Sequence, residues 1–191
     1  MSNAVLARPA PARTMTGRWV IDPGDTAVAI RARMLGGVPL HGRFEGADGV
    51  IDVPDDITRA KVTATVHSDR FRARWAPRDR FARILETASH PRLSFSGEGL
   101  RPIIESIVTP DGERPLWWLS GELTVLQVTR PLRFALGVVR LRDDAPALEF
   151  GATATLRRSD FGVTHLRGVI GDTVDVTVRG RAHRERTERT G

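Results

Sequence analysis

The sequence contains no cysteine among its 191 residues, which excludes disulfide bonds, thiolate metal ligands and a cysteine nucleophile. Lysine is almost absent too: Lys61 is the only one, so the net charge of +6 is due to arginine. An arginine-rich surface suits anionic partners such as phosphates, nucleic acid or an acidic membrane face. The same composition is compatible with a solvated surface that has no such partner, and charge alone does not decide between the two.

Long apolar runs are also missing, because no stretch approaches the roughly 18 residues that a membrane-spanning helix needs. Near the N-terminus, Arg8, Pro9, Pro11 and Arg13 interrupt the apolar residues, so this segment lacks the continuous apolar region of a secretory signal. We therefore expect a cytoplasmic protein with a disordered leader over residues 1–16, one folded domain over residues 17–183 and a disordered tail over residues 184–191.

Motifs for catalysis and metal binding are lacking as well. The histidines, at positions 41, 67, 90, 165 and 183, do not have the short spacing of zinc ligands. There is no Gly-x-Ser-x-Gly nucleophile motif, and Ser159 and Asp160 have no histidine at a spacing typical of a triad. Glycine-rich phosphate loops are absent too. We predict no metal site, no cofactor and no catalytic residue.

Alternation of apolar and polar residues with a period of two is the strongest pattern that the sequence does contain. In the stretch 148–157, Leu148, Phe150 and Leu156 fall on one face of a strand, while Glu149 and Arg157 fall on the other. The same alternation occurs in segments 28–34, 41–53, 61–67, 92–96, 117–125, 132–136 and 174–179. Because parallel strands buried on both faces would be continuously apolar, the pattern predicts eight antiparallel strands with one solvated face.

Residues 77–91 are the exception to this alternation. Pro77 suits the first position of a helix, the apolar residues Phe81, Ile84 and Leu85 fall on one helical face, and Pro91 ends the pattern. The prediction is an all-β protein with one helix inserted after the third strand. Eight antiparallel strands can stack as a sandwich or close into a barrel, and closure removes the exposed strand edges that promote aggregation.

The predicted inner face is unusual because several of its residues are small. These residues are Ala32, Ala64, Gly121, Ala152 and Ala154. An eight-stranded barrel is wide enough either to be filled by side chains or to hold one small ligand. Small residues in mid-strand leave room for a ligand, but bulky neighbours such as Trp117, Phe134 and Phe150 can also fill the gaps. Both interpretations remain open from the pattern alone.

Four segments and the last strand together resemble the YceI-like family, the lipocalin-like polyisoprenoid-binding proteins. The four segments are WVIDPGDTAVAIRARMLGGVPLHGRFEGADGVIDV (residues 19–53), APRDRFARILETASHPRLSFSGE (76–98), GELTVLQVTRPLRFAL (121–136) and LRRSDFGV (156–163). The last strand, GDTVDVTVRGRAH, fits as well, so the resemblance covers about residues 17–183. Some family positions differ. Where the family often has histidine and serine after the first Asp-Pro and an aromatic on that strand, this sequence has Gly24, Asp25, Thr26 and Ile30. A second histidine before the Leu-Gly pair is Met34, and the glycine of the Gly-Val-Thr turn is Gln127.

The resemblance implies an eight-stranded antiparallel lipocalin-like barrel, closed in part by the helix, with an apolar cavity for a polyisoprenoid chain such as a quinone or a prenyl phosphate. The predicted partner is therefore an isoprenoid or other long-chain lipid. The residues expected to contact it are Ile30, Ala32, Phe44, Val66, Phe95, Leu119, Phe134, Phe150 and Ala152. For each of these residues, a role in ordinary core packing is the alternative.

Arginines near the predicted helix and near the RSDFG turn are the candidate head-group ligands. Arg78 and Arg158 could each bind a diphosphate or quinone oxygen, or each could form a structural pair with an aspartate. For Asp79 and Asp160 we favour the structural role, with Asp160 capping its own turn.

Three further possibilities stay open at this stage. The barrel could be a reaction chamber in which Arg78 and Asp79 act on a small amphiphile. Trp117 and Trp118 point to opposite faces of their strand, so one of them could contact a second copy of the chain or, transiently, a membrane. Nucleic-acid binding is the least favoured, because the outer faces carry Thr, Ser and Glu instead of interleaved aromatics and arginines.

Overall fold

The computed structural model describes residues 15–73, 89–103, 117–141, 147–166 and 168–185, with side chains described outside 138–141. Within these residues the chain is all-β, with short 3-10 turns at Ile57–Arg59 (η1), Ser68–Arg70 (η2) and Arg158–Phe161 (η3). The strands are β1 (Gly17–Ile21), β2 (Ala27–Arg33), β3 (Pro39–Glu45), β4 (Ala47–Val53), β5 (Lys61–His67), β6 (Phe71–Ala73), β7 (Arg92–Pro102), β8 (Trp117–Val125), β9 (Val128–Leu141), β10 (Ala147–Arg157) and β11 (Thr173–Arg184).

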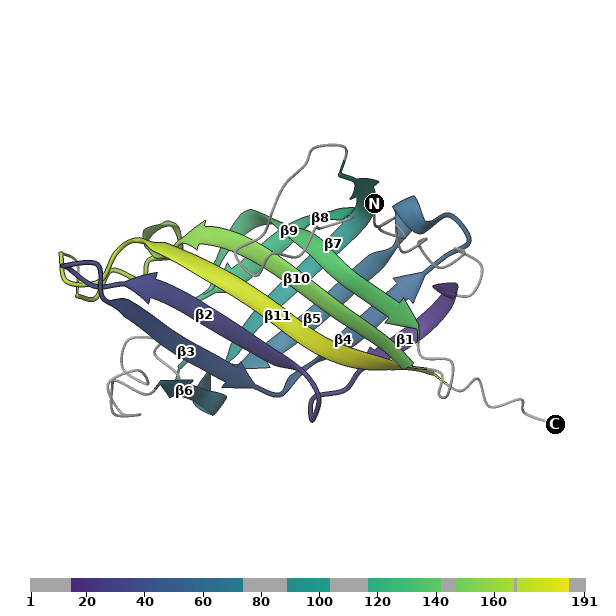
Figure 1. The fold of residues 1–191 in the computed structure, drawn as a ribbon, viewed down its shortest axis with the longest axis horizontal. Helices are drawn as coiled ribbons and strands as arrows, with labels where there is room; N and C mark the ends of the chain where they lie inside the picture. Colours follow the sequence, from purple (N-terminus) through teal and green to yellow (C-terminus); the bar gives the residue numbers. More distant parts are fainter. Residues whose placement is uncertain (1–14, 74–88, 104–116, 142–146, 167, 186–191) are drawn as a thin grey trace, which may run out of the picture.

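The strands close into a barrel. The hydrogen-bonded order β1-β4-β5-β7-β8-β9-β10-β11 returns to its start because β1 also pairs with β11, which gives a ring of eight antiparallel strands. Strands β2, β3 and β6 continue the wall of the barrel along its axis. They are attached through β2, which pairs with residues 175–179 in the N-terminal half of β11 (Figure 1). The predicted eight-stranded antiparallel barrel is therefore confirmed.

Three long strands of the barrel are each divided in two, as β1 and β2, β3 and β4, and β5 and β6, and each division has a local cause. Only the predicted strand 41–53 spans such a division; β1 and β6 lie outside the predicted segments. Between β1 and β2 the chain turns at Asp22, whose carboxylate accepts a hydrogen bond from the backbone N of Gly24 at 2.8 Å. Between β3 and β4 it passes through Gly46, whose φ of 76° favours glycine. Between β5 and β6 it makes the η2 turn. These divisions separate a half of each strand that belongs to the closed ring from a half that extends it.

The helix predicted over residues 77–91 lies, except for its last residues, outside the described part of the chain, together with Arg78 and Asp79. Of the described residues 89–91, residue 89 lies in a turn, and the other two have no regular secondary structure before β7 begins. No described helix is long and apolar enough to cross a membrane.

The buried apolar residues form three clusters along the barrel. The central cluster contains Phe95 and Phe134, a second surrounds Trp19 near the start of β1, and a third surrounds Phe161 near η3. Trp19 is only 1% exposed, and its indole Nε1 donates a hydrogen bond to the backbone O of Met15 at 2.9 Å. The barrel is thus packed with apolar side chains at both ends, and the question is how much of the space between them is empty.

Candidate ligand-binding cavity

An apolar cavity with a volume of about 320 Å³ runs through the barrel. Small-molecule pockets span roughly 300–1,000 Å³, whereas one buried water needs on the order of 15 Å³, so this space exceeds a packing defect. Residues from both ends of the barrel line it, from Met15 and Ile57 to Val163 and Ile170. The polar residues in the lining of the described cavity are Thr26, Ser94, Arg158 and His165. Its wall therefore suits an apolar chain, which is held by burial and dispersion contacts.

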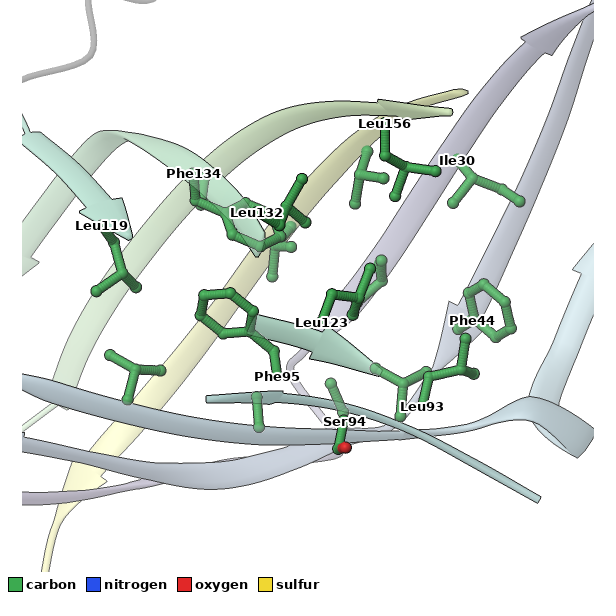
Figure 2. Close-up of a pocket in the computed structure, with 18 of the residues that line it drawn as sticks. Ile30, Phe44, Leu93, Ser94, Phe95, Leu119, Leu123, Leu132, Phe134 and Leu156 are labelled. Atoms are coloured by element: carbon green, nitrogen blue, oxygen red, sulfur yellow. The ribbon is translucent and has the colours of Figure 1, made fainter. Parts of the chain in front are cut away.

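The period-two pattern placed the predicted contact residues on the wall of this cavity. The residues that line it are Ile30, Ala32, Phe44, Val66, Phe95, Leu119, Phe134, Phe150, Ala152 and Arg158. Arg78 lies outside the described residues. Figure 2 shows side chains from β2, β3, β7, β8, β9 and β10 converging on the same space.

The small inner residues do not all leave empty space. Ala32, Ala64 and Ala152 line the cavity. At Gly121, however, an added Cβ would lie only 2.6 Å from Cζ of Phe95, so the aromatic ring already occupies that room. Ala154 is buried in the central cluster and is not part of the lining. Some small residues thus border empty space, whereas at Gly121 a bulky neighbour fills the gap.

Phe95 occupies the centre of the barrel because two neighbouring strands make room for its ring. Gly97 on β7 pairs directly with Gly121 on β8, and the ring lies against both glycines. Its other side meets Phe134 on β9 in an edge-to-face contact, with the ring centroids 5.0 Å apart. The two rings point toward each other across the cavity in Figure 2. Side chains from β7 and β9 thus narrow the space at mid-barrel without filling its ends.

Thr26 is the polar side chain in the wall at the break between β1 and β2. It is 4% exposed, and its hydroxyl has no hydrogen-bond partner in the structure. Gly180 on β11 accommodates it, since a Cβ there would lie 2.7 Å from Cγ2 of Thr26. A buried hydroxyl without a partner costs free energy, so Thr26 is a weak point of the wall.

Arg158 is a buried charged residue, 9% exposed, at the end of the cavity formed by the loop between β10 and β11. Its guanidinium donates hydrogen bonds to backbone carbonyls within this loop. Nη1 reaches the carbonyl oxygens of Val163 at 2.9 Å and His165 at 2.7 Å. Nη2 reaches that of Ile170 at 2.8 Å, and Nε reaches that of Gly171 at 3.1 Å. The side chain thus ties residues 163–166 and 168–171 together around the cavity end.

The carboxylate that organises the η3 turn is Asp172, not Asp160. Its two oxygens accept hydrogen bonds from the Ser159 backbone N at 2.9 Å and from the Ser159 hydroxyl at 2.7 Å. Arg157 Nε donates to the same carboxylate at 2.9 Å. The bonds from Ser159, with a smaller contribution from Arg157, lower the pKa of Asp172 to about 2. The prediction that Asp160 caps this turn is wrong, because the turn is closed by a residue from the start of β11 instead.

The tryptophan on the outer face of β8 is covered within its own sheet. Trp118 is half-buried, and the guanidinium of Arg133 on β9 lies 4.3 Å from the centre of its ring. Trp117 packs against the central cluster. Arg133 therefore covers part of the Trp118 ring, and Trp117 contributes to the core. Among the described residues, no group of three or more histidine and acidic side chains could hold a metal ion.

An all-antiparallel closed barrel with an internal apolar cavity defines a class of small-ligand-binding barrels. Within that class, a family model described as the YceI-like domain matches residues 19–182, which is most of the chain. The chain belongs to the YceI-like family. No curated protein matches the sequence.

Solved structures share this fold at low sequence identity. BcnA from Burkholderia cenocepacia aligns with a TM-score of 0.68 and 13% identity, over 84% of this chain and 98% of BcnA. A polyisoprenoid binding domain from Saccharophagus degradans, implicated in plant cell wall breakdown, aligns with a TM-score of 0.61 and 12% identity, over 87% of this chain and 98% of the domain. A mutant CJ YceI protein with a monobromobimane guest aligns with a TM-score of 0.56 and 18% identity, over 76% and 85% of the two chains. At these identities the likeness shows the fold alone.

Proposed function

We propose that the barrel binds an isoprenoid-type lipid, such as a quinone or a polyprenyl phosphate, and carries or sequesters it. The observation that supports this most is the apolar cavity of about 320 Å³ whose lining extends from one end of the barrel to the other. The polyisoprenoid-binding domain of similar fold supports the choice of ligand class. The proposal includes no catalytic step, since the guanidinium of the buried Arg158 is engaged in hydrogen bonds to four backbone carbonyls.

The energetics favour a carrier over a trap. Burial of a chain of eight isoprene units from water would nominally yield about 30 kcal/mol at roughly 0.8 kcal/mol per CH₂. This exceeds the ceiling of about 20 kcal/mol for non-covalent affinity, and such a lipid in fact resides in a membrane. The free energy that matters is the small difference between two apolar environments. A carrier needs this balance because it must both load and release its ligand.

Ala152 offers the sharpest test of a real ligand space, because it lines the cavity at mid-strand. In a filled core, Ala152→Leu would overpack and lower the free energy of unfolding by about 1–3 kcal/mol. In a hollow barrel, the added side chain enters the cavity at little cost in stability and reduces lipid uptake. Thr153→Leu is the matched control, since its side chain lies on the opposite face of the same strand.

The measurement is lipid content after purification, by organic extraction and mass spectrometry, followed by saturable uptake of prenyl lipids by delipidated protein. We expect uptake by the original chain and by Thr153→Leu, and uptake lowered about tenfold or more in Ala152→Leu. A protein that is always recovered empty and shows no saturable uptake would contradict the proposal.

A further inference from the structure

The exposed large apolar side chains of the described residues gather at one end of the barrel. They are Leu35, Val38, Leu166 and Val169, with exposed fractions of 80%, 56%, 40% and 41%. Exposed apolar residues scattered singly are ordinary, whereas a group of them in one place marks an interaction site. They belong to two segments, residues 34–38 between β2 and β3 and residues 163–166 and 168–171 between β10 and β11, which we call the tip.

The two segments of the tip are bonded to each other, so the apolar group is built as one unit. The backbone N of Leu35 donates to the carbonyl of Val169 at 2.7 Å, and that of Gly171 donates to the carbonyl of Arg33 at 2.7 Å. Met34 and Ile170 form an isolated antiparallel bridge between the segments. In Figure 1 both loops lie together at the extreme left of the long axis.

The backbone of the tip is strained in a way that exposes an apolar side chain. Leu166 has a φ of 57°, in the left-handed region that glycine and asparagine adopt more readily. A leucine at such a position costs stability, and it places an apolar side chain in water. Non-glycine residues in this region concentrate at functional sites, where the rest of the structure holds them in place. Arg158 is the residue that holds this loop, through the carbonyls of Val163, His165 and Ile170.

Arginines lie on the strands that lead into the tip. Residues 31–43 contain Arg31, Arg33 and Arg43 and no acidic residue. These arginines are exposed and have no salt bridge to another described residue. A surface groove of about 520 Å³ lies between the loops, lined by Arg33 beside apolar residues such as Leu35. Arg157 and Asp172 also line it, and they form a salt bridge with each other. Guanidinium groups next to exposed apolar side chains match the two layers of an anionic bilayer, phosphates outside and acyl chains beneath.

The groove and the internal cavity share a wall. Arg158 and Ile170 line both of them, so a surface seated on the tip is separated from the cavity by the loop that Arg158 holds. We propose that the tip docks onto an anionic lipid bilayer, with Leu35, Val38, Leu166 and Val169 entering the head-group region. This rests on the proposed function in one respect: a carrier of membrane lipids must meet a bilayer to exchange them.

The test is sedimentation of the full chain with vesicles of phosphatidylcholine alone or mixed with an equal amount of phosphatidylglycerol. We expect binding to the mixed vesicles that weakens as salt is added. Leu35→Ser combined with Val38→Ser should lower the partition coefficient about tenfold or more, because binding scales with the buried apolar area. Leu35→Met combined with Val38→Ile retains this area and should retain binding.

Charge is tested separately. Arg33→Gln should lower binding to the mixed vesicles about fivefold at low salt. Arg101→Gln, an exposed position on β7 away from the tip, removes the same charge and should leave binding unchanged. Equal losses in these two variants would mean that net charge, not the tip, directs binding, and would overturn the proposal.

Uptake of a prenyl lipid from detergent separates this proposal from the proposed function. A Leu35→Ser, Val38→Ser protein that still takes up lipid from detergent but no longer binds vesicles supports docking by the tip. If the original chain takes up lipid yet binds no vesicles of either composition, the docking proposal fails while the proposed function stands. Vesicle binding by the tip without any cavity lipid would overturn the proposed function alone.

If the chain instead forms a dimer that Leu35→Ser and Val38→Ser dissociate, and binds no vesicles, the tip is a self-association surface and the proposal is wrong.

Discussion

The described residues at the two ends of the barrel present different side chains to solvent although the same strands form both ends. At the tip, large apolar side chains and arginines without described salt-bridge partners face outward. At the far end, whose described residues are 15–19, 52–61 and 182–185, several outward side chains are charged and form salt bridges. Arg18 forms salt bridges with Glu185 at 3.0 Å and with Asp52 at 3.7 Å, and Lys61 pairs with Glu98 at 3.5 Å.

The ends also differ in how their turns are held. At the far end, Asp56 caps the η1 turn by accepting hydrogen bonds from the backbone N of Thr58 at 3.0 Å and from its hydroxyl at 2.6 Å. At the tip, the buried Arg158 donates hydrogen bonds to four backbone carbonyls of the loop between β10 and β11. A local cap suffices for a short polar turn. The exposed apolar loop at the tip is instead held by a side chain from the interior of the barrel.

The largest predicted effect lies in the core beneath the far end. Trp19→Ala removes a side chain that is 1% exposed, and with it the hydrogen bond to Met15. We expect the free energy of unfolding to fall by about 3–5 kcal/mol, measured by urea denaturation. Vesicle binding by the fraction that remains folded should be unchanged, since this residue lies away from the tip. Loss of binding at constant folded fraction would show that the two ends are not independent.

The corresponding change at the tip is Arg158→Leu, which leaves four backbone carbonyls without their donor. Because the loop can open and hydrate some of these groups, we expect a loss of about 3 kcal/mol. Arg157→Leu, at the neighbouring exposed position, is the control and should change stability much less. Hydrogen exchange of residues 163–171 should rise in Arg158→Leu while that of β1 stays low. Equal rises in both regions would argue against a separate anchor for the tip.

Between the two ends, a substitution at Thr26 should stabilise the protein, in contrast to the two changes above, and by a smaller amount. Thr26→Val replaces a buried hydroxyl that lacks a hydrogen-bond partner with a methyl group of similar size. The free energy of unfolding should increase by about 1 kcal/mol, because the cost of burying the hydroxyl is removed. Thermal unfolding monitored by circular dichroism provides the measurement. A decrease instead would show that the hydroxyl makes a stabilising interaction.

The smallest predicted effect is a loss of stability at low pH, caused by protonation of Asp172 beside the tip. The pKa of Asp172, lowered from 3.8 to about 2, means that the folded state favours the ionised carboxylate. Its contribution to stability is complete above pH 3.8 and is lost as the pH falls through about 2. NMR titration of the Ser159 amide should report this pKa. Asp172→Asn should abolish the transition and weaken the η3 turn already at neutral pH. An unchanged transition in Asp172→Asn would assign it to another carboxylate.

Much of the fold could be predicted because alternation along a strand is a local signal. The segments around Ala32, Val66 and Ala152 each show which residues face inward, and all three residues line the cavity. The filling of Gly121 could not be predicted in this way. It depends on the register between β7 and β8, which sets Gly97 opposite Gly121 and brings the Phe95 ring over both.

The tip was missed for a related reason. Leu35 and Val169 lie in loops without periodicity, and only the three-dimensional pairing of these loops brings their side chains together. The RSDFG resemblance identified Arg158 as a residue of interest, but its partners lie in an irregular loop and its hydrogen bonds could not be inferred from spacing. The role of Asp172 likewise arises only when the start of β11 meets the end of β10.

The pairing of β1 with β11 has a practical consequence. Trp19 lies opposite Arg184, and the backbone N of Glu185 donates to the carbonyl of Arg18 at 2.9 Å, so the first and last strands leave the barrel side by side. Both exits lie at the far end, where β1 pairs with the end of β11, whereas the tip joins the other ends of β2 and β11 (Figure 1). An affinity tag or fluorophore fused at either terminus would therefore be attached at the end opposite the tip. A sensor surface that captures the protein by such a tag would leave the tip facing the solution.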